Sequence, residues 1–219
     1  LADAVLQLDE DDGCRAIVLA SGLASFCAGA DFSTAAGAEL DPAAFYRQAM
    51  RLFRNRKPMV AAVAGPAIGG GLGLALAADF RVTCPEARFS ANFNRLGIHP
   101  GFGLSLTLPR LIGEQAAARL FYTGRRLNGT EAVEIGLADE LVARDEVLPR
   151  ARALAQEIAG SAPLAVQSTR ATLRQGWVEQ VVEANRRERE IQLEQFGTED
   201  FREGIAATAE RRTPRFAGR

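Results

Sequence analysis

Lysine, histidine and cysteine are scarce in this sequence of 219 residues. Lys57 is the only lysine, so arginine carries almost all the positive charge, and the formal net charge is −1. A chain so close to neutral has no overall field that attracts nucleic acid or an anionic membrane, and we expect neither as a partner. The three cysteines, Cys14, Cys27 and Cys84, do not have the spacing of metal ligands. We therefore expect no metal site, no disulfide framework and a reducing, cytoplasmic location.

Charged residues are absent from one long stretch, residues 58–78, which is long enough to span a bilayer. The stretch is interrupted by Pro58, Gly65, Pro66, Gly69, Gly70, Gly71 and Gly73. Such a composition makes a poor continuous helix. We therefore predict a strand, a turn and a buried helix here, and no membrane span.

Hydrophobic residues make up 47 % of the chain, enough for a folded domain with a large core. Short apolar runs predict strands at 15–20, 59–64, 81–84, 88–91 and 138–142, with a turn at 65–69. Helices are predicted after the N-cap Asp41 and at 70–78, 104–112 and 114–122, and Thr130 is expected to cap another. The alternation of strands and helices predicts an α/β core over residues 1–145.

Beyond Asp145 the apolar residues keep a helical period, which predicts a C-terminal helical region over 146–219. The first residues also have a helical pattern, with Leu1, Val5 and Leu8 on one face. Because the chain opens inside this pattern, we expect that a segment precedes it.

Two segments combine a strand end with small residues that let a ligand approach the main chain: SFCAGADF at 25–32 and KPMVAAVAGPAIGGGLGLALAADF at 57–80. The glycine run at 69–71 places unpaired amides at a helix N-terminus, where an anion or a developing negative charge is favoured. A dinucleotide fingerprint is excluded because Leu76 stands where its third glycine belongs. A phosphate loop is excluded because no Gly-Lys-Ser or Gly-Lys-Thr follows.

These motifs resemble the crotonase (enoyl-CoA hydratase/isomerase) superfamily. The resemblance rests on FCAGADF, on KPMVAAVAGPAIGGG, on TGRRLNGTEAVEIGLADELV at 123–142 and on the terminal PRFAGR, and it covers essentially the whole chain. It implies a spiral of β-β-α units followed by helices that pack across subunits, as a homotrimer or a hexamer made of two trimers. It also implies an N-terminal β-hairpin ahead of the first helix, which this sequence does not contain.

The resemblance further implies that the chain binds an acyl-CoA thioester, with coenzyme A as part of the substrate and no other cofactor. The N–H groups of Ala30 and Gly70 would form an oxyanion hole for the thioester oxygen as it becomes an enolate. The adenine of CoA would lie near residues 28–30, with Ala28 and Ala30 in contact. Arg211 stands where the family often has a phosphate-binding lysine, and it is either a CoA ligand or a solvated surface arginine.

The sequence departs from the family at its acid positions. Hydratases carry two glutamates where this chain has Gly73 and Phe93, and isomerases carry one where it has Gly101. None of these residues can move a proton, and together they predict a roomier and more apolar cavity. His99, the only histidine, is a candidate general base because of its ordinary pKa of about 6.5. The alternative interpretation is a loop histidine without a role.

Three functions remain open. The first is an enzyme of the enoyl-CoA hydratase/isomerase family, a lyase or isomerase, with a non-standard proton carrier. The second is an acyl-CoA-binding protein without catalysis, which the missing acids favour. The third is a hydrolase of a carbon–carbon bond or thioester in the same superfamily.

Overall fold

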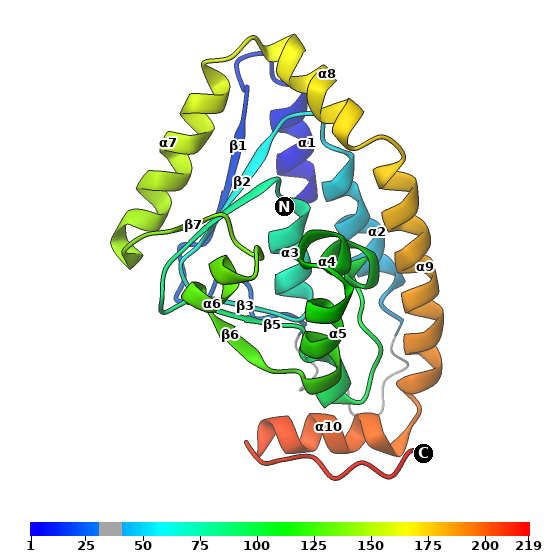
Figure 1. Ribbon diagram of the computed structural model, residues 1–219. Coiled ribbons are helices and arrows are strands. Elements are labelled where there is room, and N and C mark those ends of the chain that lie inside the picture. Colours follow the sequence, from blue (N-terminus) through cyan, green and yellow to red (C-terminus); the bar gives the residue numbers. More distant parts are fainter. Residues whose placement is uncertain (31–40) are drawn as a thin grey trace.

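The structure, a computed structural model, describes residues 1–30 and 41–219 (Figure 1). The end of the first motif, residues 31 and 32, therefore lies outside the described residues. A four-stranded sheet, parallel throughout, has the order β1 (Ile17–Ala20), β2 (Met59–Val63), β4 (Phe80–Thr83) and β7 (Glu140–Leu141). In a second sheet, β3 (Pro66–Ile68) pairs parallel with β5 (Arg88–Ser90), and β5 pairs antiparallel with β6 (Arg126–Asn128).

From β2 to β5, successive strands alternate between the two sheets, which confirms the predicted spiral of β-β-α units. The pair β2 and β3 is followed by α3 (Gly70–Ala77), and the pair β4 and β5 by the 3₁₀ helix η2 (Asn92–Leu96) and α4 (Leu104–Ile112). The prediction of a turn at 65–69 was wrong, because β3 occupies its centre. This strand exists through pairing with β5 and with Cys27, two contacts that a local sequence pattern does not reveal.

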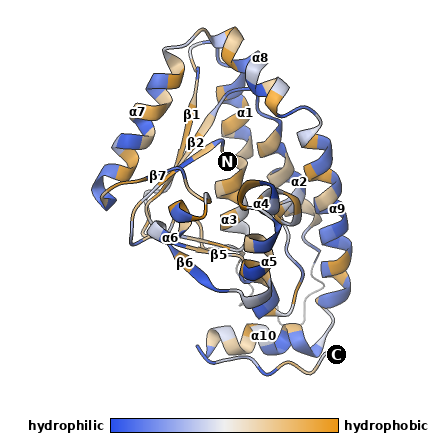
Figure 2. Ribbon diagram, viewed as in Figure 1, coloured by the Kyte–Doolittle hydropathy of each residue, from blue (hydrophilic) through white to orange (hydrophobic). Residues whose placement is uncertain are grey.

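The core lies around β2, which is buried at every position and sits between β1 and β4. Parallel strands covered on both faces need such a continuous apolar run. Helix α7 (Val147–Ala159) packs against β1, β2 and β4, and α3 also contacts β2. Figure 2 shows the hydrophobic colouring of β1, β2 and α3, in contrast to the mixed colouring of α9 (Trp177–Gln195) on the outside. The uncharged stretch at 58–78 thus contains two strands and a buried helix.

The first two helices form, although Leu1 and Leu8 do not share the inward face of Val5. The prediction that Asp41 is the N-cap of the second helix was wrong, because the N-cap is Pro42 and the Asp41 carboxylate accepts a hydrogen bond from the N–H of Ala43 at 2.8 Å. Helix α1 (Ala2–Glu10) buries Val5 with Ala2 and Asp9, whereas Leu1 and Leu8 are exposed. Asp9 is buried because its carboxylate accepts hydrogen bonds from the main-chain N–H groups of residues 56 and 57. Helix α2 (Ala43–Arg51), continued by the 3₁₀ helix η1 (Leu52–Arg54), turns Tyr46 inward and leaves Phe45 51 % exposed.

The later part of the chain is helical, as the sequence predicted. The remaining elements are α5 (Glu114–Thr123), α6 (Gly129–Glu134), the 3₁₀ helix η3 (Arg144–Glu146), α8 (Pro163–Leu173) and α10 (Glu199–Ala209). Asn128 caps α6 in a capping box with Glu131, so the prediction that Thr130 is the cap was wrong. Figure 1 shows α8 and α9 along one side of the molecule and α10 across its lower end. None of the helices in the described ranges has the length and apolar character that crossing a bilayer requires.

Candidate active site at the start of helix α3

The loop at 28–30 lies against the end of β3 because the residue before it joins the second sheet. The N–H of Cys27 donates to the carbonyl oxygen of Pro66 at 3.0 Å, and the N–H of Ile68 donates to the carbonyl oxygen of Cys27 at 3.0 Å. These two bonds form an isolated parallel bridge between Cys27 and Ala67. Two chain segments that are about forty residues apart in the sequence therefore run side by side toward the start of α3.

Two glycines make this close approach possible. A Cβ atom at position 71 would lie 2.0 Å from the carbonyl oxygen of Cys27, so any side chain at Gly71 would push α3 away from the loop. Gly29 has a φ of 91°, and a Cβ atom there would lie 2.8 Å from the carbonyl oxygen of Ile68. The same atom would lie only 3.8 Å from the amide nitrogen of Gly70, which shows how near the loop comes to the helix start.

The structure thus brings the two predicted oxyanion residues, Ala30 and Gly70, to neighbouring positions. Helix α3 begins at Gly70, whose N–H belongs to the first turn and has no acceptor within the helix. Among residues 1–30 and 41–219, neither the Ala30 nor the Gly70 N–H has a hydrogen-bond partner. As whole residues, Ala30 is exposed and Gly70 is half-buried.

Aromatic rings surround the Gly70 amide. A Cβ atom at position 70 would lie 3.8 Å from Cζ of Phe45 and 3.8 Å from Cδ2 of Phe102. Phe93 approaches from η2, with its Cζ 3.8 Å from the Cβ position of Gly69. The half-exposed Phe45 ring stacks edge-on against Phe102 with centroids 5.9 Å apart. The surroundings of Gly70 are therefore apolar.

The expectation of a roomier cavity at the acid positions was wrong. A Cβ atom at Gly73 would lie 2.6 Å from the Phe102 ring, and one at Gly101 would lie 1.9 Å from the hydroxyl oxygen of Tyr46. These two aromatic side chains occupy the space that a glutamate at either position would need. Phe93 is itself buried, at 7 % exposure. The expectation of apolar surroundings holds, because phenylalanine rings line both sides.

Phe102 and Tyr46 were not among the predicted site residues, although the sequence carries one signal. Phe102 stands between Gly101 and Gly103, and it adopts a φ of 67°, which side chains rarely accept. The turn is held by Glu188 of α9, whose carboxylate accepts hydrogen bonds from the N–H groups of Gly103 at 2.6 Å and Ser105 at 2.8 Å. Burial raises the pKa of Glu188, although these bonds oppose the shift.

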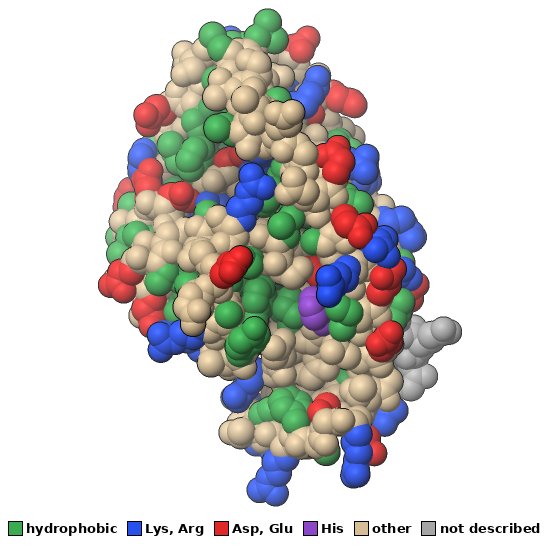
Figure 3. All heavy atoms as spheres, turned by 45° about the vertical axis from the view of Figure 1, so that its right-hand side comes forward, with side chains coloured by type: hydrophobic (Ala, Val, Ile, Leu, Met, Phe, Trp, Pro, Cys, Tyr) green, Lys and Arg blue, Asp and Glu red, His purple; other side chains and the backbone are tan. Residues whose placement is uncertain are grey.

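His99 lies near this turn without contacting the two amides. Its ring Nδ1 is 2.8 Å from the carbonyl oxygen of the adjacent Pro100. Its own carbonyl oxygen accepts a hydrogen bond from Gln192, which in turn accepts one from the Tyr46 hydroxyl at 2.8 Å. Burial raises the pKa of the Tyr46 phenol. Figure 3 shows the single histidine at the molecular surface, beside basic and apolar side chains.

The candidate CoA ligands lie at separate places. Ala28 is exposed in the loop beside α3, whereas Arg211 follows α10 in a turn where it has a φ of 56°. The Arg211 side chain is exposed and has no hydrogen bond or ion pair with any other described residue. The structure shows no contact between Arg211 and the loop at 28–30. The described part of the chain contains no group of three or more His, Cys, Asp or Glu side chains placed to hold a metal ion.

Comparisons with known proteins agree with this architecture. The family model described as enoyl-CoA hydratase/isomerase matches residues 1–219. The mitochondrial enoyl-CoA hydratase domain-containing protein 2 of Homo sapiens is 37 % identical over 229 residues, covering 100 % of this chain and 78 % of its own length. The crotonyl-CoA hydratase of Syntrophomonas wolfei is 34 % identical, with 99 % of this chain and 85 % of that protein covered.

Solved structures lead to the same family. The crystal structure of an enoyl-CoA hydratase/isomerase from Pseudoalteromonas atlantica superposes with a TM-score of 0.89 at 32 % identity, over 99 % of this chain and 87 % of that one. Fold and motifs define a crotonase-type spiral. The chain belongs to the enoyl-CoA hydratase/isomerase family of the crotonase superfamily. The name of the human relative places that protein in mitochondria, which does not support the predicted cytoplasmic location.

Proposed function

We propose that this protein is an enzyme that binds an acyl-CoA thioester and stabilises the negative charge that develops on the thioester oxygen. The N–H groups of Ala30 and Gly70 are the two donors. The observation that carries the proposal is that both amides lack a hydrogen-bond partner among the described residues. They also lie at the meeting point of the loop and the helix start. Donors fixed before the reaction stabilise an oxyanion without a reorganisation cost.

The aromatic surroundings support the thioester as the ligand. Phe45 exposes half of its surface beside the Gly70 amide, and Phe102 closes the inner side. An apolar wall strengthens a hydrogen bond to a charged oxygen because the effective dielectric constant there is low. An acyl chain along Phe45 would also bury apolar surface, which contributes about 25 cal/mol per Å².

Binding without turnover is the second candidate, and the residues at the acid positions favour it. Gly73 and Gly101 cannot carry a proton, and the space beside them holds Phe102 and Tyr46. The Tyr46 phenol is a neutral donor at physiological pH, since the ordinary pKa of a phenol is about 10 and burial raises it further. His99 has no contact with the amide pair, so we expect His99→Ala to retain whatever activity the protein has.

A thioester panel separates the two candidates. The purified protein is titrated with enoyl-, 3-ketoacyl- and dienoyl-CoA and with free CoA, while product formation, including hydrolysis, is followed by mass spectrometry. Turnover of one class, retained in His99→Ala, identifies the enzyme and its reaction. Tight binding of thioesters without product supports the binding protein. Equal affinity for free CoA and for every thioester would contradict both, because neither the amide pair nor the aromatic wall would then contribute.

We also propose that Arg211 binds a phosphate of CoA and that residues 28–30 contact the adenine. Arg211 is exposed and unpaired among the described residues, so its guanidinium is available without breaking another bond. A charge-assisted hydrogen bond contributes about 1.5–3 kcal/mol. Arg211→Gln should therefore weaken CoA binding roughly tenfold or more. The matched change Arg202→Gln, on the exposed side of α10, should leave the affinity unchanged.

A homotrimer, or a hexamer of two trimers, is the assembly that we propose. Helix α8 supports self-association because Leu164 and Leu173 are 80 % and 74 % exposed in the single chain. Sedimentation equilibrium should give three or six times the chain mass of 23.5 kDa. The mass of a monomer at micromolar concentration would contradict the proposed assembly but would leave the proposal for the amide pair unaffected.

A further inference from the structure

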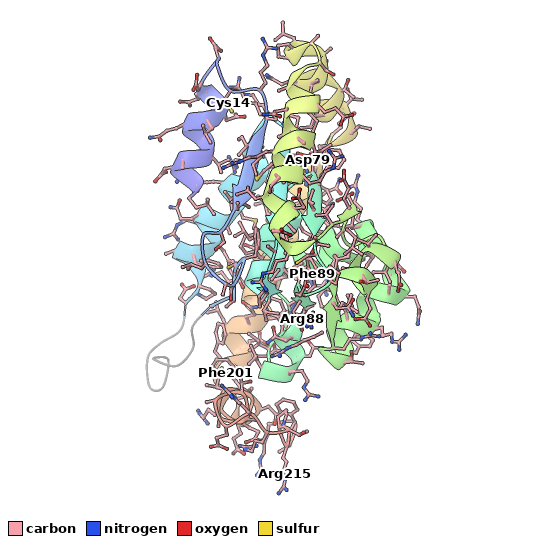
Figure 4. All side chains as sticks on the ribbon, turned by 90° about the vertical axis from the view of Figure 1, so that its left-hand side faces the viewer. Cys14, Asp79, Arg88, Phe89, Phe201 and Arg215 are labelled. Carbon is pink, nitrogen blue, oxygen red and sulfur yellow. The ribbon has the colours of Figure 1, made fainter. Side chains whose placement is uncertain are left out.

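A cavity lies at the opposite end of α3 from the amide pair. Its volume is about 190 Å³, it opens to solvent, and it is lined by the end of α3, by α4 and by the junction between α8 and α9. Helix α3 has eight residues, so the cavity and the Gly70 amide are separated by roughly 10 Å along the helix axis. Figure 4 shows Asp79, which lines the cavity, near the middle of the molecule and far from Phe201 and Arg215.

Three residues that line this cavity each carry a buried polar atom without a hydrogen-bond partner. These atoms are Oγ1 of Thr107, Nη1 of Arg174 and Nε1 of Trp177, and no other buried side-chain nitrogen or oxygen in the described part of the chain is without one. All three residues line the same cavity, and Thr107 is only 3 % exposed. A buried polar group without a partner costs about 1–3 kcal/mol, so their concentration at one place indicates a ligand that accepts hydrogen bonds.

The charge around the cavity is positive. Nη2 of Arg174 lies 2.6 Å from Oδ1 of Asp79, and Nε of Arg170 lies 3.0 Å from the same oxygen, so one carboxylate serves two guanidinium groups. Burial, together with the neighbouring positive charges of Arg170 and Arg81, lowers the pKa of Arg174 to about 10, although Asp79 opposes the shift. The cation is therefore only partly compensated, and an anion would stabilise it.

The side of the cavity formed by α4 and α9 adds to this positive charge. The guanidinium of Arg110 lies 4.7 Å from the ring centroid of Trp177. Helix α9 begins at Trp177, so its electropositive end borders the cavity. Arg81 also lines it, but its nitrogens are bonded to Leu137, Ala78 and Asp139. Arg110 is exposed and bonds only to Gln180 among the described residues, whereas Arg174 has a buried donor, Nη1, without a partner.

We infer that this cavity binds a small oxyanion, a phosphate or a carboxylate, through Arg174 Nη1, Trp177 Nε1 and the Thr107 hydroxyl. The site is separate from the amide pair, and the inference does not depend on the proposed function. The cavity volume suits a small anion with a few water molecules, since a water molecule takes about 30 Å³ of liquid. The alternative occupant is a carboxylate side chain of a second copy of this chain. Such a copy could pack against Leu173, which is exposed at the edge of the cavity.

The protein carries its own reporter, because Trp177 is the only tryptophan in the chain. Full-length protein is titrated with sodium phosphate and, separately, with sodium acetate, at constant ionic strength maintained with sodium chloride, while Trp177 fluorescence is recorded. We expect a saturable change with at least one of the two anions. The anion whose fluorescence response saturates at the lower concentration identifies the preferred ligand. Chloride alone should give no saturation.

Two variants and a control test the assignment. Thr107→Val removes the hydroxyl at nearly constant volume and should raise the half-saturating concentration roughly five- to tenfold. Arg174→Gln should raise it at least tenfold, while Arg152→Gln, an exposed arginine on α7, should leave it unchanged. Circular dichroism establishes that each variant is folded.

Three results would overturn the inference. The first is the absence of any saturable response to phosphate or acetate in the wild-type protein. The second is an equal half-saturating concentration in Thr107→Val and in Arg152→Gln. The third is a fluorescence spectrum that changes with protein concentration but not with anion concentration, which would assign the cavity to contact with a second copy.

Discussion

Replacement of Gly70 by proline removes one proposed donor and almost nothing else. Gly70 is the first residue of α3, a position where proline is tolerated because the helix makes no use of that N–H. A Cβ atom there would lie 3.8 Å from the nearest carbons of Phe45 and Phe102, which is ordinary van der Waals contact. Gly70→Ala adds the same Cβ but keeps the N–H, so the difference between the two variants reports the lost donor together with the proline Cδ that replaces its hydrogen.

The expected effect follows from the value of one preorganised donor. Loss of a single hydrogen bond to an oxyanion costs about 2.7–4 kcal/mol of stabilisation, or roughly 10²–10³ in rate. The Ala30 amide remains in Gly70→Pro, so the stabilisation should fall without vanishing. Applied to a bound 3-ketoacyl-CoA, about 3 kcal/mol corresponds to about two units in the pKa of the carbon acid, since one unit is 1.36 kcal/mol.

The assay gives the same readout whichever reaction the protein catalyses. The enolate of a 3-ketoacyl-CoA absorbs in the near ultraviolet, and its apparent pKa is measured free in solution and bound to each protein. Binding to the wild-type protein and to Gly70→Ala should lower this pKa by similar amounts. Binding to Gly70→Pro should leave the pKa close to that of the free ligand. Equal pKa values for the ligand bound to the proline and alanine variants would refute the role of the Gly70 amide. Thermal unfolding of both variants controls for folding.

Three further outcomes are expected. Gly71→Ala should lower the free energy of unfolding by about 1–3 kcal/mol more than Gly70→Ala does, because its Cβ would meet a main-chain oxygen at 2.0 Å; equal melting curves would contradict this. Gly73→Ala should lower the free energy of unfolding by a similar amount. This effect of Gly73→Ala should be smaller in a Phe102→Ala background, as a double-mutant cycle in urea can measure. The pKa of Glu188 is raised from 4.5 by burial, so the folded state holds this proton more tightly and the stability it contributes falls as pH rises above 4.5. Urea midpoints of Glu188→Gln should decline less than those of the wild type between pH 4 and 8, and parallel declines would refute the assignment.

The start of α3 shows how much of the site the sequence could predict. The glycine run at 69–71, directly after a buried apolar segment, indicates a helix N-terminus open to an anion, because helices leave their first amides unpaired. The same local logic located β2 and the C-terminal helices. The resemblance of the motifs added the loop at Ala30, which no periodicity would have linked to Gly70.

The space around the amides could not be predicted in this way. Whether Gly73 and Gly101 leave a cavity depends on which side chains from other elements fill it, and these are Phe102 and Tyr46. The positive φ of Phe102 is stabilised by Glu188, which is 86 positions away along the chain. Such packing is a property of three-dimensional neighbours, and a sequence pattern records only one element at a time.

The sequence by itself determined most of the elements, their order and the family, because periodicity and motif spacing are local properties of the chain. Tertiary structure alone decided that Pro66–Ile68 forms a strand, that aromatic rings replace the expected open space, and that Thr107, Arg174 and Trp177 share one cavity. The physical reason is the same in each case. Strand pairing, close packing and the partners of buried polar groups are set by residues distant in sequence, which meet only when the chain has folded.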